Sequence, residues 1–173
     1  MKPRLLLVLL LGLAPVLIAQ EAWTDKSRAL PDKLRKVPEL MYIRHTPNPN
    51  YPEPNNTGTN KKWDYVWKHS TTICSPEKEL TVIEAGSFIW YDSTGWKANV
   101  FMEPKEFKKE FNCPDGILKA GECYTFEKNY RWGSQLYGGD ALWFVLAKDE
   151  EGNIYKGMSL LETESEVKED NNK

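Results

Sequence analysis

The clearest hydrophobic pattern in the chain lies between residues 63 and 73, where large or apolar side chains alternate with polar ones. Successive side chains of a β-strand point to opposite faces, so a period of two predicts a strand with one buried face. The side chains expected on that face are Trp63, Tyr65, Trp67, His69, Thr71 and Ile73.

Two later segments have the pattern of hairpins. Residues 86–102 contain two apolar arms joined by Asp92-Ser93-Thr94-Gly95, which suits a type I turn followed by a glycine at positive φ. Residues 141–162 form the second hairpin, and its first arm (141–147) is apolar on both faces, as expected of a central strand. Shorter strands are predicted at 40–46 and 80–85. The segment 47–60 is rich in Pro and Asn, which predicts a surface loop.

One short amphipathic helix is predicted at residues 103–112. Pro104 suits a first helical position, and Phe107 and Phe111 are four residues apart on one face. Short strands separated by turn signals predict a mainly β protein. We therefore expect one small antiparallel β-sandwich or partly open barrel at residues 40–165, with roughly six to eight strands and this single helix.

The two ends of the chain differ from this pattern. Lys2 and Arg4 precede an apolar run that ends in small residues at Ala19, the order of features in a secretory signal peptide at 1–19. The run is too short to span a bilayer, so no membrane span is expected after cleavage. An extended or partly disordered arm with one possible helical turn should follow at 20–39, and a disordered acidic tail at 166–173. This organisation predicts a secreted or periplasmic protein.

The charge of the chain argues against nucleic acid as a partner. Without Lys2 and Arg4, 21 basic residues stand against 25 acidic ones, a net charge of −4. The basic residues are also interleaved with acids, as in EPKEFKKEF at 103–111. The chain therefore lacks the broad positive field that binding to a phosphate backbone requires.

Three cysteines in an exported chain predict one disulfide. Cys113 and Cys123 are the closest pair in sequence, and two turn signals between them can fold the chain back on itself. A zinc or redox pair is the alternative, but no C-x-x-C spacing supports it. The predicted bond is Cys113–Cys123, which leaves Cys74 as a small buried hydrophobe or as a thiol for an intermolecular bond.

His69 and His45, the chain's two histidines, are the next candidates for chemistry. On a regular strand His69 and Cys74 point to opposite faces and cannot share a metal, so we expect His69 to be packed beside Trp67 and Tyr65. His45 could join His69 in a copper or zinc site only if folding brought the two together. We predict no metal site and no cofactor.

Motifs of known catalytic sites are missing from the chain. Neither G-x-S-x-G nor H-E-x-x-H occurs. A small hydrolase or metal-dependent enzyme that uses His69 with a nearby carboxylate, Glu84 or Asp92, remains the alternative function. A purely structural envelope protein that docks through the arm at 20–39 is a third possibility.

The aromatic content is the one positive signal. Phe, Trp and Tyr make up 12% of the chain. Most of these rings suit a β core, but those at 129–140 lie among polar residues and glycines without a strand period. Such a loop suits flat recognition of a glycan, a peptide or a protein surface, although it could also be a structural lid. We therefore predict a non-catalytic, exported binding domain whose contact residues are Tyr130, Arg131, Trp132 and Tyr137.

Overall fold

The computed structural model of the protein describes residues 28–56, 58–90 and 95–168. The expected signal peptide, the first part of the arm (20–27), most of the loop of the first hairpin (91–94) and the last tail residues (169–173) lie outside the described residues. Within the described residues, no helix is long and apolar enough to cross a membrane.

The described residues are mainly β and contain two short α-helices and one 3-10 turn. The helical elements are α2 (Asp32–Arg35), α3 (Pro104–Glu110) and η1 (Pro114–Gly116). The strands are β1 (Tyr42–Thr46), β2 (Pro52–Pro54), β3 (Tyr65–Trp67), β4 (Ser70–Ser75), β5 (Leu80–Trp90), β6 (Lys97–Met102), β7 (Ile117–Leu118), β8 (Glu122–Phe126), β9 (Arg131–Gly133), β10 (Gly139–Lys148) and β11 (Ile154–Thr163). The strands outnumber the six to eight expected because β2, β7 and β9 are only two or three residues long and lie in segments interpreted as loops or turns.

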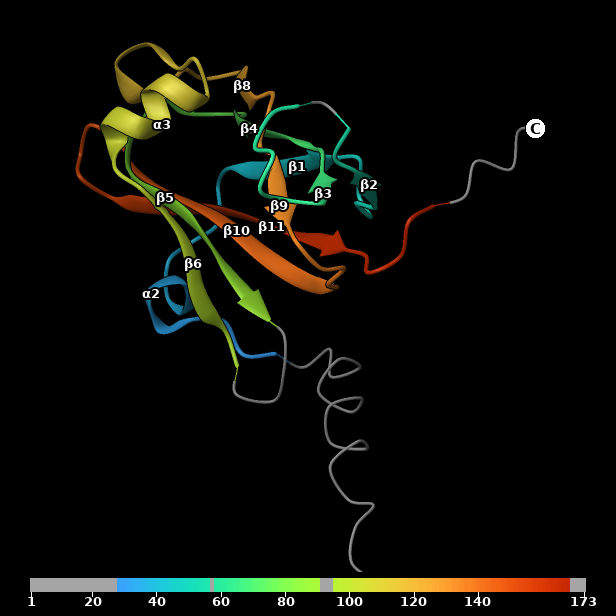
Figure 1. The fold of residues 1–173 in the computed structure, drawn as a ribbon. Helices are drawn as coiled ribbons and strands as arrows, with labels where there is room; N and C mark the ends of the chain where they lie inside the picture. Colours follow the sequence, from blue (N-terminus) through green and yellow to red (C-terminus); the bar gives the residue numbers. More distant parts are fainter. Residues whose placement is uncertain (1–27, 57, 91–94, 169–173) are drawn as a thin grey trace, which may run out of the picture.

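Across the described ranges the strands form three antiparallel sheets (Figure 1). The large sheet has the order β11-β10-β5-β6, with β7 paired to β5, and the two smaller sheets have the orders β1-β4-β8 and β2-β3-β9. Figure 1 shows the smaller sheets on one side of the large sheet and α2 on the other. The predicted fold class is confirmed, since the arrangement is that of a small antiparallel sandwich.

The main core lies between the large sheet and the smaller sheets. Ile43 and Ile73 from the β1-β4-β8 sheet pack in one cluster with Trp143, Val145 and Leu161 from the large sheet. β10 lies between β5 and β11, so its prediction as a central strand is confirmed. Its even-numbered side chains form a second cluster on the opposite face of the sheet, which explains why the strand is apolar on both faces.

Both predicted hairpins and the predicted helix are present. β10 pairs with β11 and β5 with β6, although β5 is one continuous strand over the segments expected as a strand at 80–85 and a hairpin arm. Gly95 has the expected positive φ of 90°. Pro104 begins α3, and the rings of Phe107 and Phe111 stack with centroids 4.3 Å apart in the main core.

The prediction of one continuous strand at 63–73 is wrong, because the structure divides this segment into two strands. β3 and β4 belong to different sheets, because β3 pairs with β2 and β9 while β4 pairs with β1 and β8. The alternation still governs burial between Trp67 and Ile73, where every odd-numbered side chain is buried and residues 68, 70 and 72 are half-buried. Trp63 and Tyr65 are only half-buried, because they lie at or before the start of β3.

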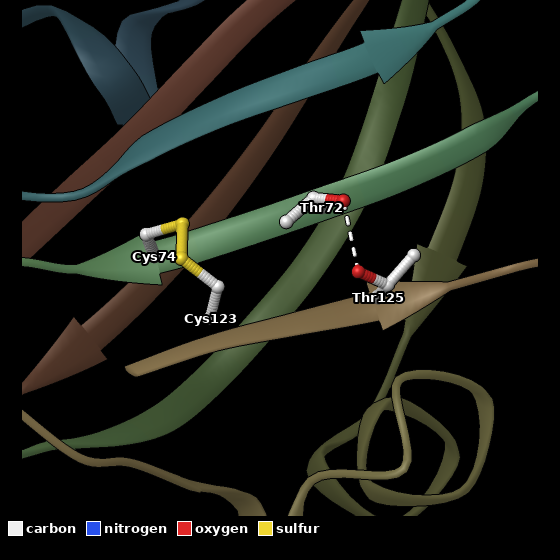
Figure 2. The surroundings of a disulfide bond; sticks show 4 residues. All are labelled: Thr72, Cys74, Cys123 and Thr125. Atoms are coloured by element: carbon white, nitrogen blue, oxygen red, sulfur yellow. Dashed lines mark hydrogen bonds between the residues drawn. A yellow bond between two sulfur atoms is a disulfide. The ribbon is translucent and has the colours of Figure 1, made fainter. Parts of the chain in front are cut away.

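The predicted Cys113–Cys123 disulfide is also wrong. Cys123 is bonded to Cys74, and the two residues lie directly opposite each other on β8 and β4 with their Cα atoms 4.1 Å apart (Figure 2). Cys113 is a free, fully buried thiol between α3 and η1, where it donates a hydrogen bond to the carbonyl of Ile117. Closeness in sequence favoured the short loop, but strand pairing decides which cysteines meet.

Figure 2 shows a second link beside this disulfide. The hydroxyls of Thr72 and Thr125 are hydrogen-bonded at 2.8 Å, two residues along the same pair of strands. These two links join β4 and β8 on the face that points away from the core, while Ile73 points into the core between them.

The described part of the arm packs against the far face of the large sheet. α2 supplies the single helical turn that was considered for this segment, and its Leu34 is fully buried with Leu142 and Phe144 of β10. The arm then follows the outer edge of β11, where the backbone amide of Lys156 donates to Pro38 and its carbonyl accepts from Leu40.

Asn48 and Asn50 bind the other end of the same edge. The side chain of Asn48 accepts from the backbone amide of Glu162 and donates to the carbonyl of Leu160. The backbone of Asn50 bonds with Glu162 and Glu164. The outer edge of β11 is therefore occupied at both ends by segments of the same chain.

Candidate functional site

The fold brings the two histidines together in the interior. His45 on β1 lies opposite Thr71 on β4, and His69 immediately precedes β4. Their ring centroids are 6.1 Å apart in an edge-to-face arrangement, and both residues are buried. The expectation that His69 is buried is confirmed, and its nearest polar neighbours come from several distant segments of the chain.

A hydrogen-bond network holds each imidazole through its Nδ1 atom. Asn129 donates from Nδ2 to Oγ1 of Thr71 at 2.8 Å, and this hydroxyl lies 3.0 Å from Nδ1 of His45. Nδ2 of Asn50 donates to Nδ1 of His69 at 3.1 Å. An Nδ1 that accepts leaves the proton of a neutral imidazole on Nε2. His69 therefore carries its proton on Nε2. His45 does so too when the hydroxyl of Thr71, which accepts from Asn129, donates its own proton to Nδ1 of His45.

The other side of both rings lacks partners. Within the described part of the chain, Nε2 of His45, Nε2 of His69 and Oδ1 of Asn129 are buried and make no hydrogen bond. Buried polar atoms are nearly always paired, because an unpaired one loses its bonds to water without replacement. In this buried polar cluster of His45, His69, Thr71, Asn50 and Asn129, the backbone of Ser159 lies within hydrogen-bonding reach of His45, and the backbone of Trp67 within reach of His69.

Both histidines are neutral at physiological pH. The pKa of His45 is lowered from 6.5 to about 4 and that of His69 to about 3, mainly by burial and in part by the nearby positive charge of Arg131. A protonated Nε2 has no lone pair to offer a metal, so this network does not present the rings as ligands. Within the described residues, no group of three or more His, Cys, Asp or Glu side chains could hold a metal ion.

Arg131 lies next to this cluster. On β9 it is paired with Trp67 of β3, and its guanidinium lies 5.2 Å from the ring centroid of Trp143. It donates to the backbone carbonyl of Tyr130 at 2.9 Å, and burial lowers its pKa, although a guanidinium remains charged at neutral pH. Among the described residues no carboxylate forms an ion pair with Arg131, and nearby Asp140 is paired with Arg28 instead.

A small cavity of about 70 Å³ lies in front of this guanidinium. Water, or a group the size of a carboxylate, fits such a space when polar groups line it. The residues around it come from β5, β6, β9, the following loop, β10 and β11, and they are Ile89, Asn99, Arg131, Tyr137, Gly139, Asp140, Ala141, Trp143, Leu161 and Thr163.

The four predicted contact residues divide into two pairs. Arg131 and Tyr137 both line the cavity, and the ring of Tyr137 lies on that of Trp67 with centroids 4.2 Å apart. Tyr130 and Trp132 form a neighbouring aromatic pair with centroids 6.0 Å apart. Trp132 pairs with the buried Val66 across the sheet, whereas Arg131 pairs with Trp67. Trp132 and Arg131 therefore point to opposite faces of the β2-β3-β9 sheet. Both rings of this second pair are half-buried.

Gly133 allows the loop after β9 to close in this way. A Cβ atom at this position would lie 2.9 Å from the ring of Tyr137 and 3.3 Å from that of Trp67. The absent side chain therefore makes room for Tyr137 to cover Trp67. The loop 134–138 thus has the structural role that the sequence left open, because it holds Tyr137 on Trp67.

Several members of the site were missed from the sequence. Asn50, Thr71, Asn129 and Trp143 are separated by long stretches of chain, and no spacing signal connects them. The rival pairing of His69 with Glu84 is not present: Glu84 is paired with Lys33, which lies over Phe144 on the far face of the large sheet. Asp92 lies outside the described residues.

The chain was also compared with known proteins. It matches no protein-family model, and no curated protein or solved structure matches it.

Proposed function

We propose that this protein is an exported, non-catalytic binding domain that recognises a ligand carrying a carboxylate, with an acidic glycan as the first candidate. The Cys74–Cys123 disulfide supports an oxidising location outside the cytosol. The ligand carboxylate would enter the cavity at Arg131, and the rest of the ligand would cross the edge strand β9 to reach the rings of Tyr130 and Trp132 outside the cavity.

The observation that carries the proposal is the guanidinium of Arg131. It is half-buried, lies over Trp143, and has no carboxylate partner among the described residues. A partly buried charge without a counterion is costly, so its retention in a cavity wall favours a ligand that supplies one. Arginine is also the side chain best suited to bind a carboxylate through two parallel hydrogen bonds.

The surroundings of the cavity have the matching polarity. The one acid in the cavity lining, Asp140, is neutralised by Arg28, so Arg131 gives the lining a net positive charge. The rings of Tyr130 and Trp132 suit the flat face of a sugar. An acidic glycan uses both features, whereas a neutral one uses only the rings.

Titration calorimetry of the mature protein with uronic-acid oligosaccharides, and with neutral oligosaccharides of the same length, tests the proposal. We expect the acidic series to bind and Arg131→Gln to weaken it by about tenfold or more, because a charge-assisted pair is worth roughly 1.5–3 kcal/mol. Arg44→Gln is the matched control, since it makes the same charge change at an exposed position on β1. Equal affinity of the two variants, or equal binding of both series, would contradict the proposal. An acidic peptide panel in the same experiment separates a glycan from a peptide ligand.

A further inference from the structure

A second hollow lies on the opposite face of the large sheet and has the opposite charge. It is a groove of about 760 Å³ over the even-numbered side chains of β10 and β11, next to the described part of the arm. Ligand sites typically measure about 300–1,000 Å³, so the groove has the size of a binding site. It is lined by Arg28, Leu30, Glu39, Trp96, Gly138, Asp140, Leu142, Met158, Ser159, Leu160, Glu162, Thr163, Glu164 and Ser165.

The floor of the groove is apolar because the arm covers only part of this face. Leu34 of α2 is buried in one cluster with Leu142 and Phe144, and Figure 1 shows α2 on this side of the large sheet. Beyond the arm, Met158 is only half-buried and Leu160 remains 43% exposed. An exposed apolar floor in a concave surface is typical of an interaction site.

The rim of the groove carries a negative charge without compensation. Among the described residues, the carboxylates of Glu39, Glu162 and Glu164 form no ion pair. Arg28 is the one basic residue in the lining, and it is already paired with Asp140. Apolar ligands with an anionic head group, such as fatty acids, would therefore be repelled, whereas a cationic partner would be attracted.

Trp96 adds a hydrogen-bond donor to one wall. Its indole Nε1 is buried and makes no hydrogen bond within the described part of the chain. An indole N–H can only donate, so its partner must carry an acceptor such as a backbone carbonyl. A peptide provides this acceptor together with apolar and cationic side chains, which a cationic amphiphile does not.

We infer that this groove binds a peptide segment of a partner protein in which Lys or Arg alternates with apolar side chains. The apolar side chains cover Met158 and Leu160, and the cationic ones meet Glu39, Glu162 and Glu164. The inference is independent of the proposed acidic ligand, because the two sites lie on opposite faces of the large sheet and share only Asp140 and Thr163, with Asp140 paired to Arg28.

Titration calorimetry with a short capped peptide in which Lys alternates with Leu and Val tests the inference. The comparison ligands are the same peptide with Glu or Ser in place of Lys, and micelles of a cationic detergent. We expect the Lys peptide to bind and the other two peptides to bind at least tenfold more weakly. Equal binding of the Glu or Ser peptide, equal binding of the detergent, or no binding of the Lys peptide would overturn the inference.

Matched variants locate the binding on the protein. The triple change Glu39→Gln, Glu162→Gln and Glu164→Gln should weaken the Lys peptide by about tenfold, since each exposed ion pair contributes a modest amount. The same change at the exposed acids Glu77, Glu79 and Glu127, which lie outside the groove, should leave the affinity unchanged.

A second pair of variants tests the apolar floor. Leu160→Ser should also weaken binding severalfold, whereas Ile154→Ser should not, because Ile154 is 46% exposed on the same strand but outside the groove. Equal effects within either matched pair would contradict the assignment to this groove.

Discussion

Acid should destabilise this protein well above the pH at which carboxylates titrate. The chain contains 2 histidines, and both are buried and neutral in the folded state. The pKa of His45 is lowered to about 4 and that of His69 to about 3, mainly by burial, whereas both should return to 6.5 on unfolding. The unfolded chain therefore binds more protons than the folded one below pH 6.5. The stability gained from the neutral rings is complete above that pH and is lost as the pH falls toward the folded pKa values.

The size of the effect follows from these pKa values. At pH 5 the unfolded rings are almost fully protonated and the folded ones almost fully neutral, so each histidine lowers the free energy of unfolding by about 2 kcal/mol relative to pH 7. The pair together should cost roughly 4 kcal/mol, a large part of the 5–15 kcal/mol that stabilises a typical domain. Near pH 5 the free energy of unfolding should fall by about 2.5 kcal/mol per pH unit, because nearly two protons are taken up.

Urea unfolding between pH 7 and pH 5, followed by tryptophan fluorescence, measures this fall. His45→Gln and His69→Gln should each remove about half of it, and the double variant nearly all, whatever their stability at pH 7. Asp149 does not interfere. Burial raises the pKa of Asp149, but hydrogen bonds from Asn153 and Lys78 outweigh this effect and hold the pKa below its usual range. The stability that the Asp149 carboxylate contributes is therefore lost only at a pH lower than that at which the histidines act. A free energy that is the same at pH 7 and pH 5, or a fall that persists in the double variant, would refute the assignment of buried neutral rings.

Four further predictions concern the disulfide, the free cysteine, Arg131 and Gly133. Replacing Cys74 and Cys123 together by Ser should lower the free energy of unfolding by about 4 kcal/mol, since the bond joins residues 49 apart. Burial raises the pKa of the Cys113 thiol to about 11, so a thiol reagent should modify one cysteine, and only after unfolding; a reactive thiol in the native protein would contradict this. Arg131→Gln should raise the pKa of both histidines in an NMR titration because it removes a nearby positive charge, whereas Arg44→Gln should leave them unchanged. Gly133→Ala should displace Tyr137 from Trp67 and cost about 1–3 kcal/mol, measured by urea unfolding with Ser134→Ala as the control.

Local patterns in the sequence were sufficient for the elements of this fold. The alternation around Trp67 and Ile73, the doubly apolar arm of β10 and the Phe107–Phe111 spacing each reflect a face that must be buried, and burial of a face is a local property. They could not show that the chain leaves one sheet for another between Trp67 and Ser70, because the sequence alternates without interruption across this break.

Contacts between distant segments explain what the sequence did not reveal. Cys74 and Cys123 meet because β4 and β8 are neighbours, a fact of topology that outweighs the shorter distance along the chain to Cys113. His45 and His69 likewise meet through the pairing of β1 with β4. The residues predicted at 130–137 were named from their chemistry alone, and only the register of β9 divides them into inward and outward side chains.

The outer edge of β11 is covered by hydrogen bonds from Asn48, Asn50 and residues 38–40, and this matters for the protein at high concentration. An open strand is a template on which another copy can extend the sheet, and repeated extension leads to aggregation. A second copy of this protein would first have to break the hydrogen bonds that the arm makes to Lys156 at one end and those that Asn48 and Asn50 make to Leu160 and Glu162 at the other. Self-association through this edge is therefore opposed by the chain's own loops.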